Sequence, residues 1–403
     1  MYNNVMRLKI LLMLPVFLFY IRGYAQENTI TLEAAVEEAK QNNPGIKAAR
    51  QRYLAALKNV TYSKTWEYPL LGAEFDSQIK NMFIISQQIP FPGKLSLKGR
   101  MARGEAGLAR AELGLKLREV IDGVKKSYWK YWQAGKNMEI YRENLDLLKR
   151  VSGISRSLYE VGKVPLSDVF KANVEIGKSE SQLVVARQER ISAQAELAAQ
   201  LNRSTGSAPG NPVQPGKTSL EYSLDDLLRS ASENSPGSRA KKYSYDRSKA
   251  GAALARFGWV PDFYLGARIG DNYTDYIAQV TLPVFFWKQA AGVSRAVYER
   301  DAALLDLESQ RAGLVKDVTG LYARFVSHDE SAVIYETNII PMTKQALSLT
   351  EEGYRSRKNS IIDLLDSQKR YLDYSIEYYI HVVERESVLA ELESLSGAGP
   401  EGE

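Results

Sequence analysis

The chain has 403 residues and no cysteine, so it is long enough for one large core or several domains and cannot form disulfides. Its 53 Lys and Arg residues against 48 Asp and Glu residues leave a formal net charge of only +5. An excess of positive charge this small argues against nucleic acid as a partner.

Residues 1–25 have the pattern of an export signal. Arg7 and Lys9 precede an apolar run, and the small residues Gly23 and Ala25 follow it. The run is short for a membrane-spanning helix, so we predict cleavage after Ala25 rather than a retained N-terminal anchor. No later stretch of the sequence approaches the roughly eighteen uninterrupted apolar residues of a membrane helix. A further membrane crossing would therefore need β-strands in a closed barrel.

The sequence repeats itself once. Residues 31–44 match residues 223–236 without a gap, and residues 159–168 match residues 354–363 with the same internal spacing. Such a repeat predicts two similar structural units. The predicted organisation is a signal peptide (1–25), a first unit (26–201), a proline-containing linker (202–222), a second unit (223–395) and a flexible tail (396–403).

Each unit contains a predicted β-hairpin, at about 66–92 in the first and about 257–287 in the second. Apolar residues alternate with polar or small ones, most clearly over residues 263–269, which is typical of strands with one apolar face. Pro90 and Pro283 follow the second strand of each hairpin. Because proline cannot pair within a central ladder, they mark the ends of these strands.

Long helices are predicted after the hairpins, over about 94–159 and about 288–353. The first range lacks proline and carries apolar residues at steps of three and four, and at 1.5 Å per residue it would reach roughly 100 Å. The second contains Pro341, where we expect a kink. Shorter return helices are predicted at 166–201 and 361–395.

The return helix at 361–395 carries two carboxylates, Asp363 and Asp366, within an apolar pattern. At 100° per residue both point away from the predicted packing seam. They could form a charged ring in a pore, or a solvated face on which Asp366 pairs with Arg370. The seam is predicted to contain Ile361, Leu365, Gln368, Leu372, Ser375, Tyr379, Val382, Glu386 and Leu389.

Four strands cannot close a membrane barrel, since the smallest such barrels need about eight. The unpaired edges therefore require other copies of the chain. Two copies would supply eight strands and three would supply twelve, with the long helices continuing each barrel as a tube.

The order and duplication of these elements resemble the TolC family of outer-membrane efflux channels. The resemblance rests on the sequence Gln-Ile-Pro-Phe-Pro-Gly-Lys at 88–94, on Tyr-Glu-Val-Gly at 159–162, and on Ile-Ile-Asp-Leu-Leu-Asp at 361–366. It implies a mainly α-helical fold with membrane β-structure, in which a homotrimer forms a twelve-stranded barrel in outer-membrane lipid and a periplasmic α-helical tunnel. The implied partners are a periplasmic adaptor and an inner-membrane pump of the RND type. The junction at 88–94 is similar to that of the heavy-metal branch, with metal or drug export as the implied activity.

The resemblance also implies roles for individual residues. Asp363 and Asp366 match paired aspartates that ring the periplasmic entrance. Asp168 and Tyr354 match a latch between neighbouring helices near the closed tip, and Asn359 stands where that latch has an arginine. The junction between barrel and tunnel would be formed by Pro90, Pro92, Gly93 and Pro283.

Other functions find less support in the sequence. The two histidines, His328 and His381, are isolated on helical stretches, and no catalytic motif is present, so we expect no enzyme. Seven methionines, two scattered histidines and no cysteine predict neither a metal site nor a cofactor. The remaining alternative is a periplasmic adaptor or scaffold with long helical hairpins.

Overall fold

A computed structural model describes residues 29–75, 82–204, 207–216, 220, 222–270 and 273–397. The predicted signal peptide and residues 398–403 of the predicted tail lie outside these ranges. The elements are β1 (Thr29–Ile30), α1 (Leu32–Asn42), α2 (Pro44–Tyr62), β2 (Leu70–Glu74), β3 (Met82–Ile89), α3 (Lys94–Glu160), α4 (Leu166–Gln200), β4 (Asn211–Pro212), α5 (Leu224–Asn234), α6 (Pro236–Arg256), a 3₁₀ turn (Phe257–Trp259), β5 (Phe263–Gly270), β6 (Thr274–Val280), α7 (Phe286–Ile334), the π-helical turn η2 (Tyr335–Ile339), α8 (Ile340–Arg355) and α9 (Ile361–Ser396).

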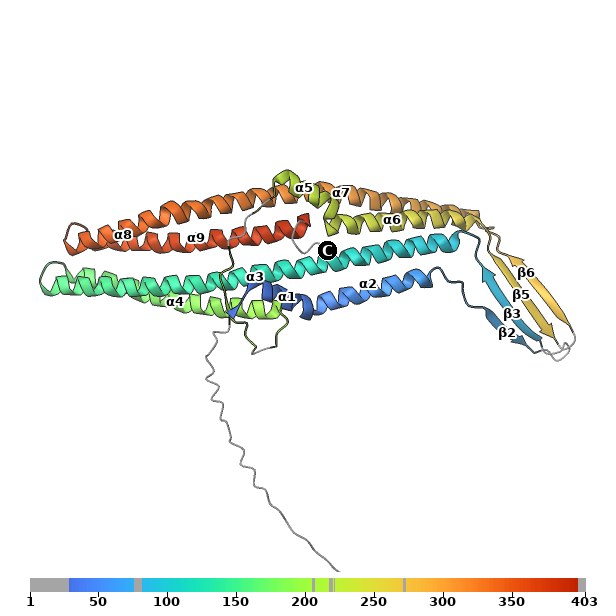
Figure 1. Ribbon diagram of the computed structural model, residues 1–403, viewed down its shortest axis with the longest axis horizontal. Helices are drawn as coiled ribbons and strands as arrows, with labels where there is room; N and C mark the ends of the chain where they lie inside the picture. The colour runs from blue at the N-terminus through green and yellow to red at the C-terminus, as the bar shows by residue number, and fades with distance from the viewer. Residues whose placement is uncertain are drawn as a thin grey trace, which may run out of the picture.

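The molecule is a long rod of helices with a β-sheet at one end (Figure 1). At the other end the chain turns from α3 into α4 and from α8 into α9. Near the middle lie the short helices α1 and α5 and the parallel pair β1–β4, which ties the linker to the start of the chain. No helix in the described part of the chain has an apolar stretch adequate to cross a membrane.

The first helices of the two repeat units, α1 and α5, have the same type of N-terminal cap. Thr31 caps α1 and Ser223 caps α5, each accepting a backbone N–H three residues on, at 3.2 Å in both cases. Pro44 and Pro236 then occupy the first positions of α2 and α6, where a missing N–H costs nothing. The repeat is visible in the sequence at these positions, but α2 and α6 were not predicted from it. These helices run beside α3 and α7 toward the sheet (Figure 1).

The core follows the apolar stripe of α3, which is 67 residues long. Val124 and Tyr128 are fully buried, and the Tyr128 hydroxyl lies 2.8 Å from the carbonyl oxygen of Ile30 and 2.6 Å from that of Val213. The buried stripe therefore also fixes the β1–β4 pair. Its main cluster contains Val120, Val124, Tyr128, Tyr131, Ala193, Leu197 and Leu201, with Leu113 and Leu117 packed against it.

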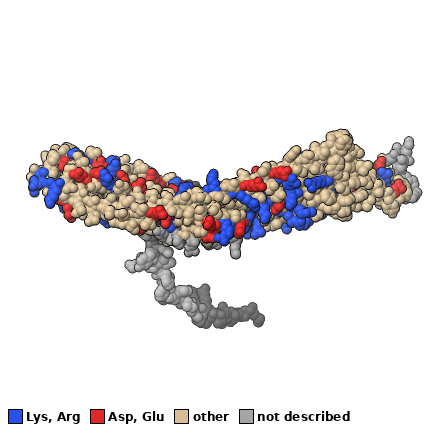
Figure 2. Space-filling model, turned by 90° about the horizontal axis from the view of Figure 1, so that it is seen from above, with Lys and Arg blue, Asp and Glu red and all other residues tan. Residues whose placement is uncertain are grey.

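The four long strands form one antiparallel sheet in the order β2-β3-β5-β6, so the two predicted hairpins pair with each other. One row across the sheet is Leu71, Ile85, Ala267 and Tyr276; the next row on the opposite face is Gly72, Ile84, Arg268 and Asp275. One face is thus largely apolar, whereas the other is mixed, with polar and small residues beside apolar ones such as Ile84. Figure 2 shows that charged side chains on the visible surface follow the helices and are sparse over most of the sheet end.

The second long helix is interrupted where the kink is predicted. The π-helical turn η2 ends at Ile339, and Pro341 lies in the first turn of α8. Proline has no N–H to donate, and its ring clashes with the carbonyl four residues earlier, here Thr337. The widened turn accommodates this clash.

The seam of α9 differs from the prediction at Leu365, Tyr379 and Val382, which are only half-buried, and Val383 is buried in place of Val382. Leu364 is fully buried, whereas Leu365 is only half-buried. Ile361, Gln368, Leu372 and Ser375 lie in the seam as expected. The two aspartates, Asp363 and Asp366, are exposed in the single chain, which agrees with their predicted direction away from the seam.

Candidate functional site at the helical tip

The end of the rod opposite the sheet is built from two helical hairpins that share one core. Tyr354, Ile361 and Leu364 from the second hairpin pack with Val151 and Ala172 from the first. Each of the five side chains is less than a tenth exposed. The tip is therefore one packed unit, and the turns at its end are held by the same cluster.

Two of the three predicted latch residues meet at this core. The Tyr354 hydroxyl donates to Asp168 Oδ2 at 3.4 Å and lies 3.0 Å from Ser155 Oγ. Burial raises the pKa of Tyr354, and the nearby carboxylate of Asp168 acts in the same direction. The phenol therefore stays protonated and joins the hairpins within one chain. Asn359 lies apart from this contact, in the turn after α8, where its backbone N–H donates to the Gly353 carbonyl at 3.2 Å.

The two turns at the tip have the same backbone form. Gly162 has φ 68° and Arg357 has φ 63°. In both turns the next residue, Lys163 or Lys358, donates its N–H to the carbonyl five residues earlier, at 2.8 and 2.7 Å. This bonding belongs to the Schellman ending of a helix, which favours glycine at the left-handed position. Arg357 therefore holds a conformation that its Cβ disfavours.

Replacing Arg357 by glycine is expected to stabilise the second turn by about 0.5–1 kcal/mol, because it removes the left-handed strain. Hydrogen–deuterium exchange over residues 353–363 should then slow about two- to fivefold. Gly162→Ala is the matched control, and it should speed exchange in the first turn. Unchanged exchange in Arg357→Gly together with faster exchange in Gly162→Ala would mean that the arginine side chain compensates the strain.

Asp363 has a structural task in the single chain. It accepts hydrogen bonds from the Ser360 backbone N–H at 2.9 Å and from the Ser360 hydroxyl at 2.8 Å, while its own N–H donates to Ser360 Oγ at 3.2 Å. This is a capping box at the start of α9. The bonds from Ser360 hold the pKa of Asp363 below its ordinary value, so the carboxylate is ionised at neutral pH.

Asp366 forms the ion pair that the alternative interpretation predicts. Its Oδ2 lies 2.9 Å from Arg370 Nε, and both side chains are more than half exposed, at 55% and 62%. An exposed i,i+4 pair contributes only a few tenths of a kcal/mol. The geometry of one chain therefore leaves Asp366 available to a neighbouring copy.

Three of the four predicted junction residues lie between β3 and α3. β3 ends at Ile89, and Gly93 precedes α3 with φ 101°, where a Cβ would lie 3.2 Å from the Phe257 ring. An ion pair ties this bend to the β5–β6 hairpin, since Lys94 Nζ lies 2.8 Å from Asp262 Oδ1. Asp262 also accepts the Phe91 backbone N–H at 2.8 Å. Pro90 and Pro92 lie within the bend, and Pro283 follows β6.

The polar seam residue Gln368 joins a hydrogen-bonded chain with the helical hairpin formed by α3 and α4. Gln368 on α9 donates to Asn144 on α3, and Asn144 donates to Ser179 on α4 at 3.1 Å. All three side chains are buried. A buried, satisfied polar chain of this kind fixes the register between helices, because any slip would leave its groups unpaired.

The prediction that the two histidines are isolated is wrong. His328 on α7 and His381 on α9 face each other, with their Nδ1 atoms 3.1 Å apart. Fifty-three positions separate them in the sequence, so only the packing of α7 against α9 brings them together.

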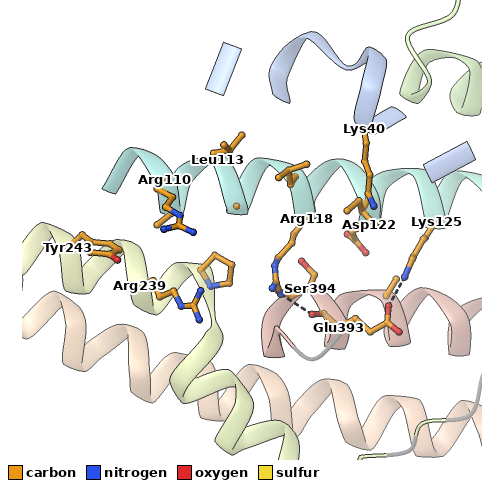
Figure 3. A pocket seen from close by; sticks show the side chains of 16 residues that line it. Lys40, Arg110, Leu113, Arg118, Asp122, Lys125, Arg239, Tyr243, Glu393 and Ser394 are labelled. Carbon is orange, nitrogen blue, oxygen red and sulfur yellow. Dashed lines mark hydrogen bonds and ion pairs between the residues drawn. The ribbon is translucent and has the colours of Figure 1, made fainter. Parts of the chain in front are cut away.

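A cavity of about 660 Å³ lies farther toward the sheet, between α3, α6 and the end of α9 (Figure 3). Arg118 points at the end of α9 and donates to the carbonyl oxygens of Glu393 at 3.1 Å and Ser394 at 2.9 Å. Lys125 forms an ion pair with Glu393. Burial lowers the pKa of Arg118, and Arg239 across the cavity lowers it further. These contacts fasten α9 to α3 by satisfying helix-end carbonyls.

Comparisons with known proteins agree on one family. The sequence profile of the outer membrane efflux protein family matches residues 35–203 and 227–397. The cobalt-zinc-cadmium resistance protein CzcC of Cupriavidus metallidurans is 23% identical over 366 residues, covering 87% of this chain and 85% of CzcC. Outer membrane protein TolC of Vibrio cholerae is 23% identical over 373 residues, covering 83% of each chain. The crystal structure of CusC superposes with a TM-score of 0.79 at 16% identity, over 91% of this chain and 92% of CusC. The profile matches most of the chain, which therefore belongs to the outer membrane efflux protein family, the family of TolC and its relatives.

Proposed function

We propose that three copies of this chain assemble into an outer-membrane channel for efflux. In this arrangement each copy contributes four strands to a twelve-stranded barrel, and its helices continue the pore as a periplasmic tunnel. The signal proposed at 1–25 would direct the chain out of the cytoplasm, and residues 26–201 and 223–395 would act as two similar units. The observation that carries the proposal is the four-stranded sheet.

The sheet has open edges and an apolar face that the single chain does not cover. Among the described strands, β2 and β6 each pair on one side only. On the apolar face Leu71 is 78% exposed and Tyr276 is 87% exposed. Unpaired edges and uncovered apolar rows are unfavourable in water. A closed barrel in lipid would satisfy both, with the apolar rows outward and the polar rows toward the lumen. A periplasmic adaptor or scaffold would not need an exposed apolar sheet face of this kind.

We further propose that Asp363 and Asp366 from three copies ring the periplasmic end of the pore. Both lie at the start of α9, away from the seam, and at the end of the rod opposite the sheet. Six carboxylates close together would attract cations and disfavour anions. The contact between Tyr354 and Asp168 would act beside them as a latch, because it joins the hairpins that would have to separate in an opening tip.

The proposed partners follow from the family. Its members are outer-membrane components of tripartite efflux systems, so a periplasmic adaptor and an inner-membrane pump, of the RND type, would dock at the helical part. Within the described ranges, the exposed turns at 161–165 and 356–360 lie at the end of the rod opposite the sheet and would face the adaptor.

The assembly can be tested by native mass measurement of the full chain in mild detergent. A stable trimer is expected, since only an added copy can pair the edges of β2 and β6. Salt washing of membranes is the companion test, and the protein should remain with the outer membrane. A monomer or dimer, or release by salt, would contradict the proposal and favour the adaptor or scaffold.

A further inference from the structure

The pair formed by His328 and His381 has the form of a ligand site. These are the only histidines in the sequence. Their Nδ1 atoms are 3.1 Å apart and their ring centroids 5.3 Å apart, and both side chains are half-buried and so reachable from solvent in the single chain. Two facing imidazole nitrogens need a proton or a metal ion between them, because two lone pairs repel.

The spacing of the two nitrogens suits a metal ion. A transition-metal ion binds imidazole nitrogen at about 2.0–2.1 Å. At that bond length, nitrogens 3.1 Å apart subtend an angle of roughly 100° at the metal. This angle lies about midway between the right angle of tetragonal Cu²⁺ and the tetrahedral angle of Zn²⁺, so the spacing fits either ion. Cu²⁺ stands highest in the affinity order for nitrogen ligands.

Arg324 and Glu384 place opposite charges near His328. Arg324 lies 3.7 Å from Glu384, so these charges largely balance each other. A neutral His328 with its proton on Nε2 presents a free lone pair at Nδ1, which is the state that binds a metal.

The π-helical turn η2 supports the second ligand. The Tyr335 ring lies 5.3 Å from the His381 ring, and the Tyr335 hydroxyl donates to Glu377 Oε2 at 2.8 Å. Arg385 on α9 also pairs with Asp329 on α7 at 2.6 Å. The imidazole of His381 thus has a tilted aromatic ring as a neighbour, and an ion pair near it in the sequence joins the same two helices. Such support holds ligand rings in place before the metal arrives.

We propose that His328 and His381 form a bidentate imidazole site for a divalent transition-metal ion, with Cu²⁺ bound more tightly than Zn²⁺ and water completing the coordination. Within the described ranges no group of three or more His, Cys, Asp or Glu side chains is arranged to hold a metal, so protein ligands would fill only two positions. An open coordination sphere gives exchangeable rather than permanent binding. The bound ion would tie α7 to α9 beside the π-helical turn. This inference does not depend on the trimer or on the aspartate ring.

The test uses the full chain in detergent, purified without a histidine tag and freed of metal with a chelator. Titration with Cu²⁺ is expected to give one ion per chain, with an electron paramagnetic resonance spectrum that shows two coupled nitrogens. Zn²⁺ should compete weakly and Mg²⁺ should not compete. Binding should fall steeply below about pH 6, where imidazole takes up protons.

Two single variants, His328→Asn and His381→Gln, provide the matched controls. Each keeps an amide that can hydrogen-bond to the remaining imidazole, so metal-free melting temperature and oligomer mass should stay unchanged. Copper affinity should fall at least tenfold in each. Wild-type affinity in both variants, or a spectrum with fewer than two coupled nitrogens in the native chain, would overturn the site. If a variant does not fold, the nitrogen count of the native chain alone decides.

Discussion

Replacing Leu364 by alanine is expected to destabilise the helical tip by about 2–5 kcal/mol, because a fully buried leucine leaves a cavity between two helical hairpins. Leu364 packs with Val151 and Tyr354, so the loss reaches both hairpins and the contact between Tyr354 and Asp168. The measurement is thermal unfolding of the detergent-solubilised protein, together with hydrogen exchange in α8 and α9. Faster exchange should be concentrated at the tip, since the sheet end has its own contacts.

Leu365→Ala is the matched control for this prediction. It removes the same atoms from the next position of the same helix, but Leu365 is only half-buried in the single chain. We expect less than half of the loss seen for Leu364→Ala. Equal losses in the two variants would show that Leu365 is covered in the assembled protein, and an equally small loss in both would contradict the packing of the tip.

Removing the charges of Asp363 and Asp366 together is expected to lower cation selectivity in planar bilayers on the order of tenfold, if the two carboxylates ring the pore. The change should be made to asparagine rather than alanine. Asparagine keeps an oxygen that can accept the Ser360 N–H, whereas alanine would remove the capping box and cost about 0.5–2 kcal/mol at the start of α9. The effect should be strongest at low salt, because the Debye length is about 8 Å at physiological ionic strength.

The variant Arg370→Gln distinguishes between a charged ring in the pore and a solvated outer face. In a ring, Arg370 offsets part of the charge of Asp366, so its removal should raise cation selectivity. On an outer face neither the double asparagine variant nor Arg370→Gln should alter ion selectivity. That result would contradict the proposed gate. The remaining roles would be the ion pair of Asp366 with Arg370 and the capping box of Asp363.

Local periodicity explains what could be predicted from the sequence. The hairpins and long helices depend on residues two to four positions apart, so their patterns are visible in the chain itself. The choice between Leu364 and Leu365 is different. On a helical wheel both lie beside the seam, and only the position of the first hairpin selects one of them. The capping box can be seen in the sequence as Ser360 followed by an acid three residues later. Asp363 was instead interpreted together with Asp366, as part of a charged ring or a solvated face.

Contacts distant in sequence could not be predicted in the same way. His328 meets His381 because α7 and α9 pack in one register, and the π-helical turn after α7 contributes to that register. The partner of Gln368, Asn144, likewise lies on a helix 224 positions away in the sequence, a separation for which a single sequence gives no spacing rule. Helices α2 and α6 were missed for another reason. Only two of the 19 residues of α2 are buried apolar ones, so its pattern is weak.

The even number of long strands in the described sheet has a geometric consequence. Every neighbouring pair in the order β2-β3-β5-β6 is antiparallel, so the two edge strands, β2 and β6, run in opposite directions. When the edge of one copy meets the edge of the next, the alternation continues across the boundary without a parallel seam. Rotational symmetry alone can then close the ring, and no copy has to be inverted. In the proposed barrel the helices of all copies would consequently leave from the same rim, which would place every tip on one side of the membrane.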